Sequence, residues 1–102
     1  MNIIYDNLSK LVPYKTCIKE KKNDDLLIVS NINSEILYLN EVSRDFYELC
    51  DGNNSISVII SKLMEIYDVS LQQLEEDIVS LIRDMQWDNI LGLKEIMNNE
   101  KV

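Results

Sequence analysis

Acidic side chains stand next to one another at two places in the sequence, Asp24-Asp25 and Glu75-Glu76-Asp77. Paired carboxylates can act as a general acid and base when apolar or basic neighbours shift their pKa values. Neither set has such neighbours. The second set also falls near the start of a predicted helix, where acidic residues complement the helix dipole. We therefore interpret both sets as solvated surface and not as a catalytic pair.

The residue types that nucleophilic and metal chemistry need are scarce in this chain. It has no histidine, which removes the commonest general base and the commonest metal ligand. Its two cysteines, Cys17 and Cys50, are far apart and form no Cys-x-x-Cys pair, so we interpret them as small buried hydrophobic residues. There is no calcium-loop motif, and two glycines leave no glycine-rich phosphate loop. The sequence therefore predicts no enzyme, no metal site and no cofactor.

Length and charge narrow the remaining classes of protein. A chain of 102 residues predicts a single domain, here with a lead-in arm over 1–13 and a frayed tail over 98–102. Its net charge of −8 repels nucleic acid, whose binding depends on Lys and Arg. No apolar run approaches the length of a membrane span, and the N-terminus lacks the basic region of a signal peptide. We therefore expect a cytoplasmic protein that binds neither nucleic acid nor membranes.

Hydrophobic periodicity and turn residues predict an α+β fold. The expected order is a three-stranded antiparallel sheet followed by three helices, which is the shape of a winged helix-turn-helix. The last helix carries four acidic residues against one arginine, which argues against a DNA-reading role. The predicted strands are 14–20, 26–29 and 36–39, and the helices run from Asn40 to Gly52, from 54 to 67 and from 70 to 87.

The third predicted strand is apolar at four consecutive positions, 36–39, which is more than a small domain easily covers on both faces. A partly uncovered strand can pair with an added peptide strand. On the last helix, Val79 lies off the inward stripe, on a flank with Glu75, Arg83 and Gln86. Val79 is either one wall of a groove between strand and helix or an ordinary surface residue. Full burial of the strand is the alternative reading of its apolar run.

Several of these residues resemble a known family. Leu39-Asn40, the run from Phe46 to Gly52, Ile59-Ile60 and the closing Ile90-Leu91 look like the PqqD-like family, and the match spans roughly residues 34–91. These proteins are also called RiPP recognition elements. The resemblance implies a winged-helix fold that is not used on DNA. It also implies a non-catalytic protein that binds the leader of a ribosomally made precursor peptide and presents it to a radical SAM maturase or a leader peptidase.

Combined with the strand and helix pattern, the resemblance predicts that the leader pairs along residues 34–39, in the cleft between the third strand and helix 70–87. Arg83, the only cation on that helix, would pair with a leader carboxylate. For Trp87 two roles stay open, partial burial against the C-terminal segment or contact with the partner enzyme. The main alternative function is a structural protein whose third strand pairs with a second copy, as a homodimer. The predicted peptide-binding residues are Glu35, Ile36, Leu37, Tyr38, Leu39, Glu75, Val79, Ile82, Arg83 and Gln86.

Overall fold

The computed structural model describes residues 7–95, and these confirm an α+β fold with antiparallel strands and three complete helices. A short N-terminal turn, residues 7–10, precedes the first strand. The predicted tail, 98–102, and the first six residues of the predicted arm lie outside the described residues. The elements are β1 Val12–Lys15, β2 Lys19–Asn23, β3 Leu26–Ser30, β4 Ile36–Asn40, α2 Glu41–Glu48, α3 Ile56–Met64, α4 Leu71–Trp87 and β5 Leu91–Lys94.

The second and third predicted strands correspond to β3 and β4, which lie in a three-stranded antiparallel sheet of order β2-β3-β4. The register pairs Leu27 with Leu39 and Ile28 with Tyr38. Side chains of directly paired residues point to the same face of a sheet. Leu27 and Leu39 therefore share the face toward the helices, whereas Ile28 and Tyr38 share the outer face.

The first predicted strand, 14–20, is wrong as a single element. The chain leaves one strand after Lys15 and enters the next at Lys19. β1 pairs with β5. In the sequence, the only sign of β5 is the closing apolar pair Ile90-Leu91. These partners lie at opposite ends of the sequence, and local periodicity carries no information about such a pairing. The predicted single sheet is therefore two sheets, and the end of the predicted arm belongs to one of them.

Helix boundaries follow local capping chemistry. Ser55 and Ser70 are the N-caps of α3 and α4, and their hydroxyls accept from the amides of Val58 and Gln73 at 3.3 Å and 3.1 Å. Asn40 is the N-cap of α2, as expected, although there the hydroxyl of Ser43 accepts from the Asn40 amide at 3.1 Å. After α4 the chain turns at Asn89, whose φ is 60°, the left-handed conformation that ends many helices.

The core lies where α2, α3 and α4 meet the inner face of β3 and β4. Phe46 and Tyr47 of α2 are completely buried at its centre, and the Tyr47 hydroxyl donates to the carbonyl of Ile90 at 2.8 Å. This bond joins α2 to the segment that leads into β5. The other buried apolar residues are Val12, Pro13, Leu27, Val29, Leu39, Cys50, Ile56, Ile59, Ile60, Leu63, Leu74, Ile78, Ile82, Met85, Ile90 and Leu91.

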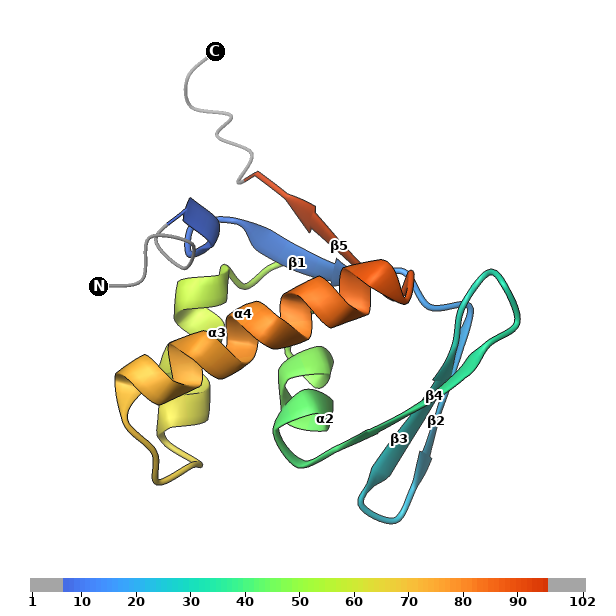
Figure 1. The fold of residues 1–102 in the computed structure, drawn as a ribbon, viewed down its shortest axis with the longest axis horizontal. Coiled ribbons are helices and arrows are strands. Elements are labelled where there is room, and N and C mark those ends of the chain that lie inside the picture. Colours follow the sequence, from blue (N-terminus) through green and yellow to red (C-terminus); the bar gives the residue numbers. More distant parts are fainter. Residues whose placement is uncertain (1–6, 96–102) are drawn as a thin grey trace.

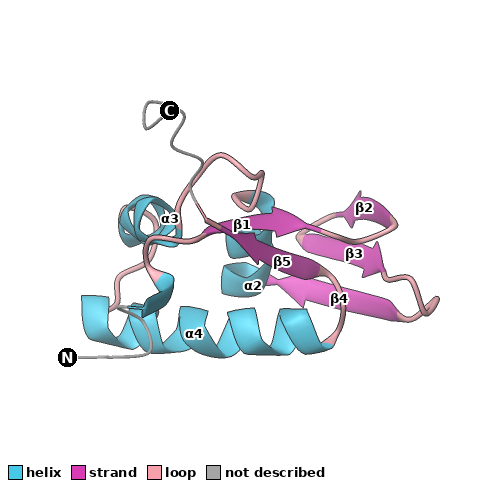
Figure 2. Cartoon of the chain, turned by 90° about the horizontal axis from the view of Figure 1, so that it is seen from above, coloured by secondary structure: helices cyan, strands magenta, loops and turns pink. Residues whose placement is uncertain are grey.

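The long helix α4 separates two parts of the molecule, the N-terminal turn and strand β4. Figure 1 shows the N-terminal turn and β4 on opposite sides of α4. Figure 2, seen from above, shows β4 as the strand of its sheet nearest to α4. The described residues contain no helix long and apolar enough to cross a membrane.

Candidate peptide-binding site

Strand β4 lies at the edge of its sheet, with β3 as its only strand partner among residues 7–95. One row of backbone amides and carbonyls therefore faces outward, as on any edge strand. The strand carries no proline and no lysine that would discourage pairing. Its outer face is strongly apolar, because Ile36 is 59% exposed and Tyr38 is 64% exposed. The strand thus offers a complete pairing edge together with uncovered apolar side chains.

The inner face of β4 differs along its length. Leu39 is buried, whereas Leu37, opposite Val29, is only partly buried against the core. The prediction that the strand is partly uncovered is thus met on both faces. The outer face is open throughout, and the inner face is open toward the start of the strand. A peptide paired with the edge would have neighbouring side chains on either face.

The loop before β4 is tied to the end of α4 through Asn31, the only buried polar residue among those described. Its side-chain amide donates to the carbonyl of Asp88 at 2.7 Å and to the carboxylate of Glu35 at 2.8 Å. Its side-chain oxygen accepts from the amides of Asn33 and Glu35 at 2.9 Å and 3.0 Å. Asn31 therefore sets where β4 starts relative to the C-terminal end of α4. Glu35, which is predicted to bind the leader, forms hydrogen bonds to the Asn31 side chain within this loop.

The predicted helix residues line a different surface. Val79, Ile82, Arg83 and Gln86 line a groove of about 710 Å³ whose opposite wall includes Leu8 of the N-terminal turn. None of the described residues that line this groove comes from β4. Glu75 lies one turn before Val79 on the same flank. The structure thus separates the ten predicted residues into a strand group and a helix group.

Val79 is therefore a groove wall, but not in a groove shared with the strand. Helical periodicity in the sequence marks which stripe faces the core, whereas it leaves open which of the two flanks faces a given strand. Leu81, placed in the core stripe from the sequence, lies about 200° around the helix from Val79 at about 100° per residue. It is partly buried against the core. Leu81 and Asp77 accordingly lie on the flank of α4 opposite Val79. Figure 1 shows the N-terminal turn on one side of α4 and β4 on the other.

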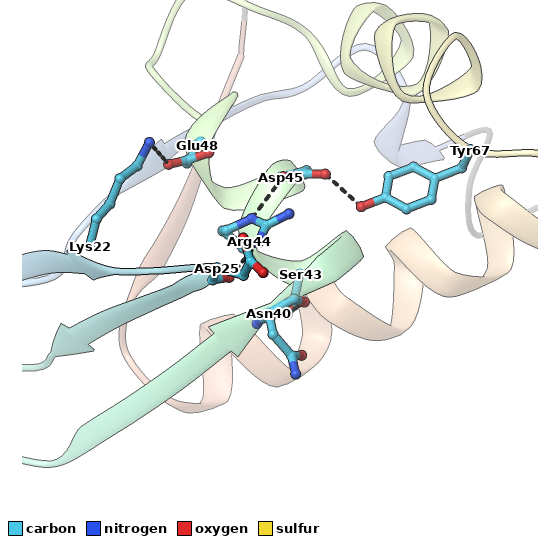
Figure 3. Close-up of polar contacts among 8 residues, drawn as sticks. All are labelled: Lys22, Asp25, Asn40, Ser43, Arg44, Asp45, Glu48 and Tyr67. Atoms are coloured by element: carbon cyan, nitrogen blue, oxygen red, sulfur yellow. Dashed lines mark hydrogen bonds and ion pairs between the residues drawn. The ribbon is translucent and has the colours of Figure 1, made fainter.

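A polar cluster around α2 holds the three-stranded sheet against the helices (Figure 3). Lys22 of β2 forms an ion pair with Glu48 at 2.8 Å. Arg44 donates to the carbonyl of Asp25 in the β2–β3 turn and to the carboxylate of Asp45 at 2.9 Å. The hydroxyl of Tyr67, beyond α3, donates to Asp45 at 2.5 Å. The cluster therefore connects the hairpin, α2 and the end of α3, and it helps to position β4.

The titration of this cluster predicts how stability depends on pH. Partial burial acts to raise the pKa of Asp45, but hydrogen bonds from Arg44 and Tyr67 outweigh it and hold that pKa below its ordinary 3.8. Burial and the bond to Asp45 raise the pKa of Tyr67 from 10.0 to about 12. A carboxyl group whose pKa is lowered by folding stabilises the folded state at pH values above its ordinary pKa. This contribution is lost as the pH falls below that value. A raised tyrosine pKa contributes stability that is lost as the pH rises from 10.0 toward 12.

We expect the free energy of unfolding to fall in both windows, and Asp45→Asn to flatten both slopes. Urea denaturation at a series of pH values measures this. Tyr67→Phe is the matched control, because it should flatten the alkaline slope and retain an acid slope from the Arg44 bond. Identical pH profiles for all three proteins would contradict the role of the cluster.

The described residues contain no cluster of three His, Cys, Asp or Glu side chains that could hold a metal ion. Burial raises the pKa of the Cys50 thiol, which donates to the carbonyl of Phe46 at 3.2 Å, so this thiol stays protonated near neutral pH. The chemistry on the surface is instead that of a pairing strand edge beside a helix, which is the chemistry of a peptide-binding protein.

Comparison with known families agrees with that class. The model of the family "Coenzyme PQQ synthesis protein D (PqqD)" matches residues 25–91, which is more than half of the chain. The chain therefore belongs to the PqqD family, whose members are non-catalytic accessory proteins that bind a precursor peptide. Comparisons with curated proteins and with solved structures gave no match.

Proposed function

We propose that this chain is a single-domain, non-catalytic chaperone in the cytoplasm that binds the leader of a ribosomally made precursor peptide. The leader adds a strand to the free edge of β4 and lies against α4. The chaperone presents it to a maturation enzyme, either a radical SAM enzyme or a leader peptidase. The open edge of β4 beside α4 is the observation that carries this proposal. In this view α3, α4 and the hairpin form a winged helix-turn-helix that serves a peptide and not DNA.

Backbone pairing and side-chain burial share the binding energy. Each backbone hydrogen bond contributes roughly 0.5–1.5 kcal/mol, and each buried leader side chain roughly 1.5–3 kcal/mol. Ordering a disordered leader costs several kcal/mol, so the balance lies near −7 to −9 kcal/mol, or roughly micromolar affinity. Because backbone pairing hardly depends on sequence, the apolar contacts set selectivity.

Alternation along the leader strand divides its side chains between two environments. One set lies on the outer face beside Ile36 and Tyr38, and the other lies on the inner face near Leu37. The flank of α4 on the β4 side, with Leu81, supplies the helix wall. A leader segment with apolar residues at alternate positions fits both faces. Asp77 on the same flank favours a basic leader residue beside the inward-facing set.

The first test is a calorimetric titration of this protein with the leader segments of short peptides that are encoded near its gene. We expect saturable one-to-one binding at micromolar affinity, lost when the leader is scrambled. The second control uses two versions of the same leader, one with the odd-numbered and one with the even-numbered backbone amides methylated. One of these two peptides should lose at least tenfold in affinity, because it cannot donate to β4. Equal affinity for all four peptides would contradict strand addition.

The same edge allows a second function, self-pairing of β4 with another copy as a homodimer. The exposure of Ile36 and Tyr38 is the observation that favours it, since uncovered apolar strands promote association. Sedimentation equilibrium separates the two functions. A mass that doubles with concentration and does not return to the monomer on leader addition would favour self-association.

A further inference from the structure

A second surface of the molecule has the shape of a groove, and it is not at β4. It lies on the other side of α4, where Leu8, Val79 and Ile82 provide apolar walls, and its volume is about 710 Å³. At its margin stands Trp87, whose side chain is 86% exposed, more than that of any other large hydrophobic residue described. Arg83, Asp84 and Gln86 complete the described lining. An exposed tryptophan beside the apolar walls of a groove is typical of an interaction surface.

The charges of this groove select the chemistry of its occupant. Arg83 is the only cation of α4, and it makes no ion pair with any described residue. Every other charged residue of α4 is acidic. A partner whose surface is acidic and offers no apolar side chain would therefore be repelled along most of the helix. The lining also contains the carboxylate of Asp84, but at about 100° per residue Asp84 lies about 140° around the helix from Val79, whereas Arg83 lies only about 40° from it. Arg83 is therefore the charged residue next to the apolar walls, and an aromatic or aliphatic side chain beside a single carboxylate suits both. Tryptophan and arginine are also the residues most enriched at the energetic centres of protein interfaces.

The geometry of the groove argues against a second leader strand. Its described walls come from α4 and from the N-terminal turn, and neither offers a strand edge for backbone pairing. It therefore accepts side chains from a folded surface or a helix. Figure 1 shows β4 on the other side of α4, so a leader on β4 leaves the groove open. Both surfaces can be occupied at once, with α4 as the wall they share.

We propose that this groove, defined by Leu8, Val79, Ile82, Arg83 and Trp87, is the docking site for the enzyme that receives the leader. The enzyme inserts an apolar side chain between α4 and the N-terminal turn and places a neighbouring carboxylate on Arg83. This inference rests on the proposed function. It assigns the helix residues singled out in the sequence to the enzyme, and it gives Trp87 a role in that contact.

Trp87 is the only tryptophan of the chain, so 5-fluorotryptophan places a single fluorine at the groove. The leader alone should leave this ¹⁹F resonance in place, and the unlabelled maturation enzyme that accepts this leader should shift or broaden it. A probe that needs no enzyme is 2-naphthylacetate, compared with 2-(2-naphthyl)ethylammonium. The carboxylate should shift the resonance saturably at millimolar concentration, and the ammonium should not. Equal responses to the two naphthyl compounds, or none to either, would overturn the assigned groove chemistry.

Substitutions separate failure of this inference from failure of the proposed function. Arg83→Glu should weaken enzyme binding at least about tenfold and leave leader affinity, measured by calorimetry, unchanged. Lys62→Glu, an exposed position on α3, makes the same charge change elsewhere and should leave both affinities unchanged. Intact leader binding with no effect of Arg83→Glu on the enzyme would overturn the docking site alone. Loss of leader binding to the unsubstituted protein would instead overturn the proposed function.

Discussion

Leu81→Gln is expected to weaken leader binding about 30-fold, whereas Val79→Gln leaves it unchanged. The two positions are both partly buried on α4, but on opposite flanks. Leu81 lies on the flank opposite Val79, and in the proposed complex this flank faces β4 and buries an inward-facing leader side chain. Losing one such apolar contact costs about 2 kcal/mol, which corresponds to about 30-fold in affinity. Calorimetric titration with the same leader measures both values.

Both variants introduce the same residue, glutamine, so a difference in leader affinity reports the position of the substitution on α4. Glutamine is a good helix former and uncharged, so neither substitution changes the charge of α4 or its helix propensity much. Thermal melts establish that both variants are folded before binding is compared. The opposite result, with Val79→Gln impaired and Leu81→Gln normal, would place the leader in the Leu8 groove. It would also remove the enzyme docking site from that groove.

Asn31→Leu is expected to lower the free energy of unfolding by about 2–4 kcal/mol. The Asn31 side chain is 2% exposed and makes four hydrogen bonds, two as a donor and two as an acceptor. Leucine has a similar size but no polar group, so the Asp88 carbonyl and the loop amides lose their partner. Each group left unsatisfied costs about 1–3 kcal/mol, less where water can reach it. Urea denaturation measures the change.

The same substitution should also weaken leader binding, because the loop that starts β4 would no longer be held at the end of α4. Asn33→Leu is the matched control. Asn33 is exposed, and only its backbone amide bonds to Asn31, so this change should stay within about 0.5 kcal/mol. Equal free energies of unfolding for Asn31→Leu and Asn33→Leu would contradict this role. They would indicate that local turn contacts hold the loop and that its contact with α4 does not.

Elements that depend on neighbours in the sequence were predictable. The caps at Ser55 and Ser70, the turn at Asn89 and the apolar stripe that buries Leu74, Ile78 and Met85 all follow from periodicity and local hydrogen bonding. The pairing strands β3 and β4 follow from their runs of apolar residues between turns. The family was also recognisable, because its residues recur at spacings that the helices preserve.

Elements that depend on contacts between distant segments were not predictable. The pairing of β1 with β5 joins residues about 80 positions apart, and no local pattern records it. Asn31 lies between the second and third predicted strands, where any turn residue would fit, and nothing in the sequence shows that its side chain reaches the carbonyl of Asp88. The groove beside Val79 needed Leu8, a residue of a segment to which the sequence assigned no firm structure.

The amino-acid sequence by itself determined the class of this protein. Its lack of histidine, its acidity and its apolar third strand direct it to peptide binding, because composition and short-range order decide which chemistry is available. Tertiary structure alone decided where that chemistry lies. A helix has two flanks beside its buried stripe, and only the packing of α4 between the N-terminal turn and β4 determines which flank faces the turn and which faces the strand.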